Sequence, residues 1–248
     1  MRSTTRRLRT KLRVLRGAAP TPRVIQNTIT ANSLAHLQKA LGWSKPINLN
    51  YAFLHEFDYL IDINDRRIND ASVVASACAN VACTTVVEIG TGQGHTTAIM
   101  AEHAPNATVY TVNIPPEEIL TGGKLTTYAP SRDQIGEFYR ARGCTNVKQI
   151  YANTNIWTPT YGRIDVAFID GCHDAEFVYS DSVKVLKECR PGSVIMWHDF
   201  APDLMMKYDW IRNVCIGVEW LFTDGIIRGP ILQLKDSWVG LYRVPEHA

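Results

Sequence analysis

The sequence lacks the features that mark several classes of protein. No uncharged apolar run approaches the roughly 18 residues of a membrane-spanning helix, so we expect no such segment. Neither the G-x-S-x-G elbow of serine hydrolases nor the G-x-x-x-x-G-K phosphate loop is present. The chain also has no internal repeat. Its 248 residues, 46% of them hydrophobic, suffice for a globular domain that buries its core without disulfide or metal staples.

Closely spaced cysteine pairs are absent as well. None of the six cysteines belongs to a C-x-x-C pair, which argues against a zinc ribbon and against a small disulfide-bonded scaffold. They stand at positions 78, 83, 144, 172, 189 and 215. We therefore expect a cytoplasmic protein with reduced thiols.

Acidic residues are missing from the first part of the chain. Residues 1–23 carry eight of the 26 basic side chains and no acid, so the remainder has 18 basic against 24 acidic residues, a net charge of −6. An acidic body is a poor partner for nucleic acid, whereas the basic arm could contact an anionic surface or stay solvated. We expect three parts: a basic arm at 1–23, a helical segment at 24–69 and a main domain at 70–248.

Strand-like and helix-like segments alternate from residue 84 onward. This alternation predicts an α/β fold with a Rossmann-like, doubly wound, mostly parallel sheet. We expect seven strands, the last two forming a C-terminal antiparallel hairpin, and an N-terminal helical extension that begins with a helix at 24–41. The expected strands are 84–89, 109–112, 147–151, 164–169, 193–197, 225–234 and 238–244. The other expected helices are 70–81, 96–103, 131–143, 174–189 and one beginning near 204.

The densest motif is the run Glu88-Ile89-Gly90-Thr91-Gly92-Gln93-Gly94, which joins the first of these strands to a helix. Glycine permits tight turns and lets a ligand approach the backbone closely. A dinucleotide-binding loop spaces its glycines as G-x-G-x-x-G, and here the third glycine comes one residue early. The carboxylate of Glu88 would repel a pyrophosphate but could accept a hydrogen bond from an ammonium group.

This E-x-G-x-G-x-G arrangement resembles motif I of class I S-adenosylmethionine-dependent methyltransferases. The similarity continues through 108–113, through Ile169-Asp170-Gly171-Cys172-His173 and through 186–200, which contains Trp197-His198-Asp199. It looks most like the small bacterial O-methyltransferases with I-D-G-x-H after strand four and H-D or D-D after strand five. The resemblance implies that S-adenosylmethionine is the cofactor and that its binding residues are Glu88, Gly90, Thr91, Gly92, Gly94, Asn113, Asn153 and Asp170.

Two of these positions depart from the family pattern. The residue that ends strand two holds the ribose hydroxyls and is acidic in the family, but here it is Asn113, whose amide accepts through oxygen only. The position near the adenine amine usually carries an acid too, and here it is Asn153. Both changes could weaken the affinity for the cofactor. Glu117 could take over at the ribose if its loop folds back.

A second group of residues combines acids and histidines. The resemblance implies catalytic roles for Asp170, His173 and His198, and a metal site formed by Asp170, His198 and Asp199. Bound Mg²⁺ or another divalent metal would lower the pKa of an acceptor hydroxyl, whereas without a metal a histidine would act as general base. In catechol-type O-methyltransferases the pair after strand five is Asp-Asn, Glu-Asp or Asp-Asp. His198 departs from that pattern, and its nitrogen suits Mn²⁺, Fe²⁺ or Zn²⁺ better than Mg²⁺. The sequence leaves both routes open.

The sequence thus predicts an S-adenosylmethionine-dependent methyltransferase that acts on an oxygen of a small hydroxylated molecule. Nucleobase methylation is disfavoured, because the run Asp170-Gly171-Cys172-His173 lacks the Pro-Pro-aromatic pattern of that class. The alternatives are a non-catalytic Rossmann-like scaffold with a degenerate cofactor site and an NAD-dependent oxidoreductase, which the glycine spacing and Glu88 oppose. A homo-oligomer is compatible with the sequence, which carries no code for one.

Overall fold

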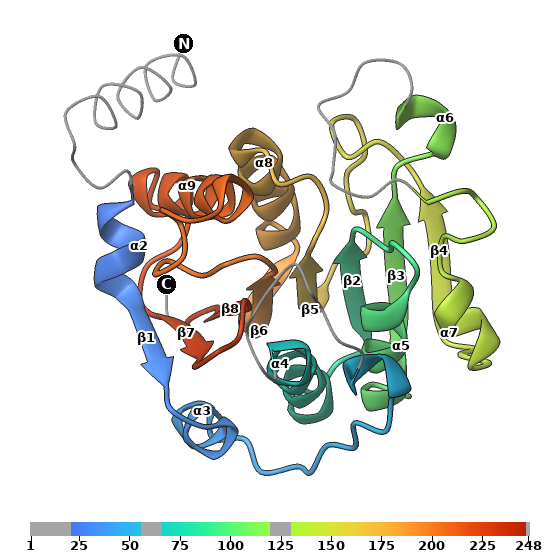
Figure 1. Cartoon of the computed structure of the whole chain (residues 1–248), viewed down its shortest axis with the longest axis horizontal. Coiled ribbons are helices and arrows are strands. Elements are labelled where there is room, and N and C mark those ends of the chain that lie inside the picture. The colour runs from blue at the N-terminus through green and yellow to red at the C-terminus, as the bar shows by residue number, and fades with distance from the viewer. Residues whose placement is uncertain (1–20, 56–65, 120–129, 247–248) are drawn as a thin grey trace.

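The computed structural model describes residues 21–55, 66–119 and 130–246 (Figure 1). Its helices are α2 (Pro22–Asn27), α3 (Leu34–Leu41), η1 (Ala52–His55, a 3₁₀ helix), α4 (Arg66–Asn80), α5 (His95–His103), α6 (Pro116–Ile119), α7 (Glu137–Ala141), α8 (Ala175–Leu186) and α9 (Asp209–Thr223). Its strands are β1 (Thr28–Ala31), β2 (Thr85–Ile89), β3 (Thr108–Asn113), β4 (Val147–Tyr151), β5 (Ile164–Ile169), β6 (Cys189–Trp197), β7 (Ile231–Leu234) and β8 (Gly240–Arg243).

The strands form one sheet in the order β1-β7-β8-β6-β5-β2-β3-β4. Neighbouring strands are parallel except at β8, which runs antiparallel to both β6 and β7. The predicted Rossmann-like, mostly parallel fold with a C-terminal hairpin is confirmed, but the sheet has eight strands where seven were expected. From β2 the chain proceeds outward through β3 and β4, and then returns to β5 on the other side of β2. Ligands bind at such a switch point.

The additional strand is β1, and the prediction of one helix over 24–41 was wrong. Three residues of β1, Thr28-Ile29-Thr30, are β-branched and favour an extended backbone. This strand pairs in parallel with β7, with Thr28 opposite Ile231 and Ala31 opposite Leu234. Helical structure remains on either side as α2 and α3. The N-terminal segment therefore completes an edge of the sheet and is not purely a helical extension.

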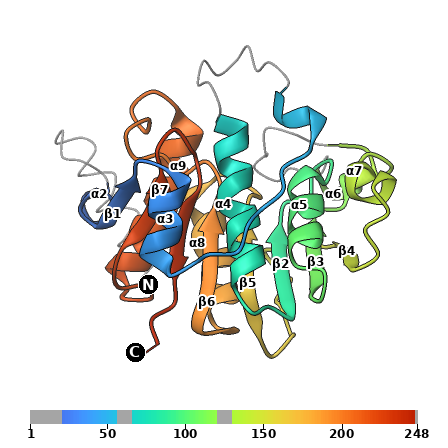
Figure 2. The ribbon, with the colours of Figure 1, turned by 90° about the horizontal axis from the view of Figure 1, so that it is seen from below.

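Successive residues of the central strands alternate between two hydrophobic layers. Val86 of β2 and Phe168 of β5 pack on the face covered by α3, α4 and α5 (Figure 2). Their neighbours Val87 and Ile169 pack on the opposite face, with side chains of α8 and α9. Because both faces are buried, polar side chains can meet solvent chiefly where the strands end, and the candidate site lies at their carboxyl ends.

Several predicted boundaries shift. The helix expected over 131–143 forms only as α7 and is preceded by turns, although the N–H of Ser131 donates to Gln134 at 3.0 Å as a capping pair does. The helix expected to reach residue 189 ends at 186, where β6 is about to begin. The first hairpin strand starts at 231 rather than 225. No described helix is long and apolar enough to cross a membrane. Residues 1–20 of the basic arm expected at 1–23 lie outside the described residues.

Candidate active site

The glycine loop joins β2 to α5 at the carboxyl end of the sheet. Gly90, Gly92 and Gly94 have positive φ angles of 101°, 51° and 87°, in a region that other residues rarely adopt. A Cβ on Gly90 would overlap the carbonyl oxygen of Asp170, whereas a Cβ on Gly92 would meet nothing within 4 Å. Gly90 therefore lets the end of β5 pack against the loop, and Gly92 leaves open space beside its backbone.

Glu88 is enclosed beside this loop, with 1% of its surface exposed. Its Oε2 accepts hydrogen bonds of 2.5 Å from the hydroxyls of Thr97 and Thr111. The Thr111 hydroxyl is 2.6 Å from that of Thr91, which accepts a hydrogen bond from Gln149 Nε2. Burial raises the pKa of Glu88 to about 8, so the carboxyl is largely protonated at neutral pH. Glu88 and Thr91 thus support the glycine loop through a hydroxyl network.

Asn113, at the end of β3, holds the same loop from another side. Its Oδ1 accepts from the N–H of Gly92 at 3.2 Å, and its Nδ2 donates to the carbonyl of Ile114 at 2.9 Å. An aspartate could make the first hydrogen bond but not the second, which gives a physical reason for asparagine here. The amide oxygen retains one lone pair for a ligand hydroxyl.

The remaining nucleoside candidates lie at the ends of neighbouring strands. Tyr151, the last residue of β4, stands opposite Asn113 in the sheet. The guanidinium of Arg132 lies 4.4 Å from the Tyr151 ring and forms an ion pair with Glu117 of α6 at 2.8 Å. Asn153 follows β4, where its Oδ1 accepts the N–H of residue 155 and shapes a turn. Glu117 is therefore held near the strand end where a ribose acceptor was expected.

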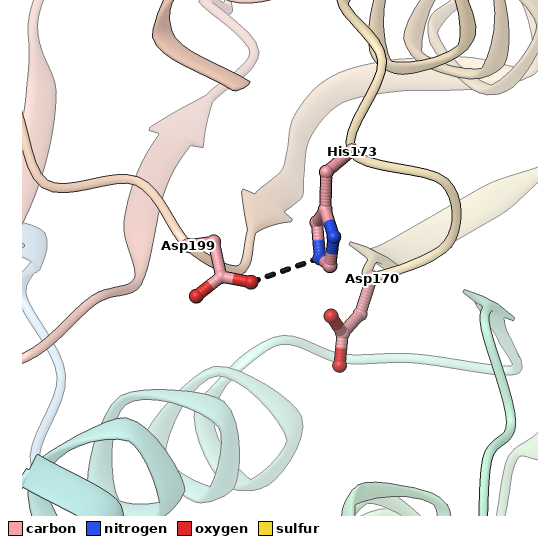
Figure 3. A group of neighbouring side chains, drawn as sticks. All are labelled: Asp170, His173 and Asp199. Atoms are coloured by element: carbon pink, nitrogen blue, oxygen red, sulfur yellow. Dashed lines mark ion pairs between the residues drawn. The ribbon is translucent and has the colours of Figure 1, made fainter. Parts of the chain in front are cut away.

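Asp170, His173 and Asp199 come together beyond the carboxyl ends of β5 and β6 (Figure 3). Asp170, His173 and Asp199 each offer a ligand atom within 4.8 Å of the others. His173 Nε2 lies 2.9 Å from Asp199 Oδ2. His198 Nδ1 lies 3.1 Å from Asp170 Oδ1 and 3.5 Å from Asp199 Oδ2. The four residues singled out in the sequence form one group, which we call the Asp–His cluster.

Electrostatics in the Asp–His cluster favour a positive charge among the carboxylates. Burial lowers the pKa of His198, but Asp170 and Asp199 outweigh burial and raise that pKa well above its ordinary value. Burial would raise the pKa of Asp199, but His198 and His173 hold it well below its usual range. The positive charge can reside on an imidazolium or on a metal ion.

Two imidazole nitrogens of the cluster, His173 Nε2 and His198 Nδ1, are buried and lie 2.9 and 3.1 Å from carboxylate oxygens without the geometry of a hydrogen bond. Both are the nitrogens nearest to the aspartates. Asp199 adds a backbone φ of 53°, an unusual value for a residue other than glycine. These residues fit a divalent metal held by nitrogen and oxygen donors together.

Asp70, in α4, was not identified from the sequence. Its Oδ1 accepts hydrogen bonds of 2.7 Å from the hydroxyl of Ser237 and the N–H of Trp238. Its Oδ2 lies 2.9 Å from Arg66 Nη1 and 3.5 Å from His198 Nε2. The His198 ring thus has a carboxylate at each nitrogen. The sequence signal for Asp70 was an acid at the start of a helical run of otherwise small and apolar residues. In the structure Asp70 is buried, with 8% of its surface exposed.

Asp170 connects the Asp–His cluster to the glycine loop. Its backbone packs against Gly90, and its N–H donates to the carbonyl of Ile89 at 2.7 Å. Asp174 occupies the N-cap position of α8, where its side chain makes no capping hydrogen bond. Gly90 thus lies against the backbone of Asp170, whereas Asn153 follows β4 and precedes Thr154, whose hydroxyl donates to Asp181 of α8 at 3.2 Å.

Comparisons with known proteins agree with this geometry. Residues 87–200 match a family model described as a methyltransferase domain. The matched segment contains the glycine loop and all four residues of the Asp–His cluster. No curated protein matches the chain in sequence.

Solved methyltransferases share the fold. The O-methyltransferase NovP is 14% identical, with a TM-score of 0.55 over 72% of this chain and 80% of that one. A putative O-methyltransferase from Klebsiella pneumoniae is 14% identical, with a TM-score of 0.52 over 86% and 88%. An O-methyltransferase family protein from Burkholderia thailandensis is 16% identical, with a TM-score of 0.51 over 87% and 71%. Residues 87–200 thus form a methyltransferase domain, on a fold that the chain shares with solved O-methyltransferases.

Proposed function

We propose that the protein transfers the methyl group of S-adenosylmethionine to a hydroxyl oxygen of a small molecule. The contact between the glycine loop and the Asp–His cluster is the observation that carries this proposal. Gly90 packs against the backbone of Asp170, so a methyl donor bound over the loop would be next to an acceptor held at the cluster. Holding the two reactants in such proximity is a large part of catalysis for a displacement reaction.

The residues around the loop fit the donor. Gly92 offers open space beside its backbone, and the Asn113 oxygen next to it can accept a hydrogen bond from a ribose hydroxyl. Glu117, held by Arg132, is a second acceptor for that sugar. The bound donor supplies a methyl group on a positively charged sulfur. The acids of the neighbouring cluster favour that charge electrostatically.

The transfer is a displacement at carbon. The acceptor oxygen forms a bond to the methyl carbon, the carbon–sulfur bond breaks with its electron pair remaining on sulfur, and the hydroxyl proton leaves. A divalent ion at the cluster would lower the pKa of the hydroxyl and fix its position. In the metal-free route, the neutral form of His198 or His173 takes the proton, and the aspartates that raise the pKa of both rings stabilise the resulting imidazolium. The metal-assisted route is favoured by the two buried nitrogens, which face carboxylate oxygens without hydrogen-bond geometry and could act as ligands together with them.

The acceptor is proposed to be a small hydroxylated molecule, because the cluster suits a hydroxyl group and the acidic body repels a phosphate backbone. The family match argues against the oxidoreductase alternative. The basic arm and the oligomeric state stay outside this proposal.

Calorimetric titration with S-adenosylhomocysteine tests the cofactor half of the proposal. We expect saturable binding, and no binding at millimolar ligand would overturn the proposal. A mass-spectrometric screen of catechols, phenols and sugars, with S-adenosylmethionine as donor, tests the other half. A product that is 14 mass units heavier and carries the new methyl group on oxygen supports the proposal, whereas methylation on nitrogen alone contradicts the proposal.

A further inference from the structure

Ligand atoms of Asp170, His173 and Asp199 lie within 4.8 Å of one another, and His198 Nδ1 adjoins the carboxylates of Asp170 and Asp199 at 3.1 and 3.5 Å. Atoms that bind one ion at about 2.0–2.2 Å lie about 3 Å apart when they are neighbours in its coordination shell. The separations of 2.9, 3.1 and 3.5 Å between imidazole nitrogens and carboxylate oxygens are of that size. The arrangement is compatible with a single ion contacted by both chemical types of donor.

The donor types discriminate between metals. Mg²⁺ prefers an octahedron of oxygen atoms and keeps several waters, whereas imidazole suits first-row transition ions. A histidine in place of one carboxylate ligand would by itself weaken Mg²⁺ binding. Here His173 joins His198, so half of the available protein donors are nitrogens, and both donor nitrogens are buried without hydrogen bonds.

The His198 ring is also oriented for coordination. Asp70 Oδ2 lies 3.5 Å from Nε2, so a ring that keeps its proton on that nitrogen would present the Nδ1 lone pair to an ion between Asp170 and Asp199. Asp70 is itself fixed by Ser237 and Trp238. A carboxylate behind a histidine ligand is a common second layer of metal sites and fixes the tautomer of the ring.

We propose that Asp170, His173, His198 and Asp199 bind a first-row transition ion such as Mn²⁺ or Fe²⁺ in preference to Mg²⁺, with Asp70 as the positioning residue of His198. The inference rests on the proposed function only in assigning the ion to the acceptor hydroxyl. The selectivity itself is a property of the free protein and can be measured without a substrate.

The test uses the full-length protein after EDTA treatment and dialysis. Mn²⁺ binding is followed by loss of the free-ion EPR signal, and Mg²⁺ is added as competitor. We expect Mn²⁺ to bind about tenfold or more tightly than Mg²⁺. Equal affinities for the two ions, or no binding of either at millimolar concentration, would overturn the proposal and leave the cluster as an ion-pair network.

Two variants assign the metal selectivity to particular residues, and a third serves as their control. His198→Asp restores an all-oxygen pair and should lower the preference for Mn²⁺ over Mg²⁺ by about tenfold. Asp70→Asn should weaken Mn²⁺ binding by about 10–100-fold, with circular dichroism reporting on the fold. His36→Gln, in the exposed part of α3, is the matched control and should leave both affinities unchanged. Unchanged selectivity in His198→Asp, or equal effects of His36→Gln, would refute the assignment.

A parallel titration with S-adenosylhomocysteine separates the two proposals. Cofactor binding without metal selectivity defeats the inference and leaves methyl transfer standing. Metal selectivity without cofactor binding defeats the proposed function and leaves the metal site standing.

Discussion

The same substitution at two glycines of the loop should have different effects. Gly90→Ala and Gly92→Ala each place a methyl group on a backbone with positive φ, of 101° and 51°. Alanine in that region costs about 1–2 kcal/mol, and about 0.4–1 kcal/mol returns because alanine restricts the unfolded chain. The methyl group of Gly92→Ala meets nothing within 4 Å. We therefore expect it to lower the free energy of unfolding by about 1 kcal/mol, a decrease in Tm of about 2–4 °C.

Gly90→Ala should be more damaging to the fold. Its methyl group would overlap the carbonyl oxygen of Asp170 and lie 2.9 Å from the backbone nitrogen of Gly171. Backbone rather than a flexible side chain must move, which adds about 1–3 kcal/mol to the conformational strain. We expect a total loss of about 2–5 kcal/mol in the free energy of unfolding.

Urea denaturation and titration with S-adenosylhomocysteine together distinguish the two effects. Gly92→Ala should remain folded but lose about tenfold or more in ligand affinity, because its methyl group fills space that the ligand needs. Gly90→Ala should lose stability first. Wild-type affinity in Gly92→Ala would refute the assignment of the open space to the cofactor, and equal stability of the two variants would refute the packing argument for Gly90.

Three further substitutions address other parts of the molecule. The folded state raises the pKa of Glu88 from 4.5 to about 8 and so binds its proton more tightly than the unfolded chain does. The free energy of unfolding should then fall as pH rises from about 5 to about 8, by at most about 1.4 kcal/mol per pH unit. Glu88→Gln should flatten this slope in urea titrations, and an unchanged slope contradicts the burial argument. Asp170→Asn should reduce methyl transfer about 100-fold or more while S-adenosylhomocysteine affinity stays within about threefold; parallel losses would make Asp170 mainly a cofactor ligand. Glu219, 3% exposed, accepts the N–H groups of Arg23 and Val24 at 2.8 and 2.9 Å. Glu219→Gln should cost about 1–3 kcal/mol of unfolding free energy, and a neutral result in denaturation would show that this anchor is dispensable.

The central strands were predictable because their residues carry a local signal. β4 and β5 begin and end at the expected residues. β5 is an apolar run apart from Asp165, whereas β4 at the edge of the sheet alternates less buried polar residues with Val147, Ile150 and Tyr151. The end of β5 then gave the position of Asp170, and the end of β6 gave those of His198 and Asp199. Parallel strands place such residues at one edge of the sheet, so their proximity followed from the fold class alone.

Features that depend on distant residues were not predictable. β1 is four residues long within a helical pattern, and its extended backbone is stabilised by pairing with β7. The protonated state expected of Glu88 depends on burial beside Thr97 and Thr111, which belong to two other elements. The position of Asp70 behind His198 depends on the packing of α4 against the C-terminal hairpin. Each case is set by tertiary context rather than by local sequence.

The pairing of β1 with β7 also bears on how the chain is synthesised. Thr28 finds its partner Ile231 only about 200 residues later, and closing so long a loop is entropically costly. During translation, β2, β3 and β4 can associate well before the hairpin leaves the ribosome, whereas β1 has no neighbour in the sheet until then. A nascent chain stalled ahead of residue 231 should therefore be cleaved readily near Ile29, while its central strands already resist protease.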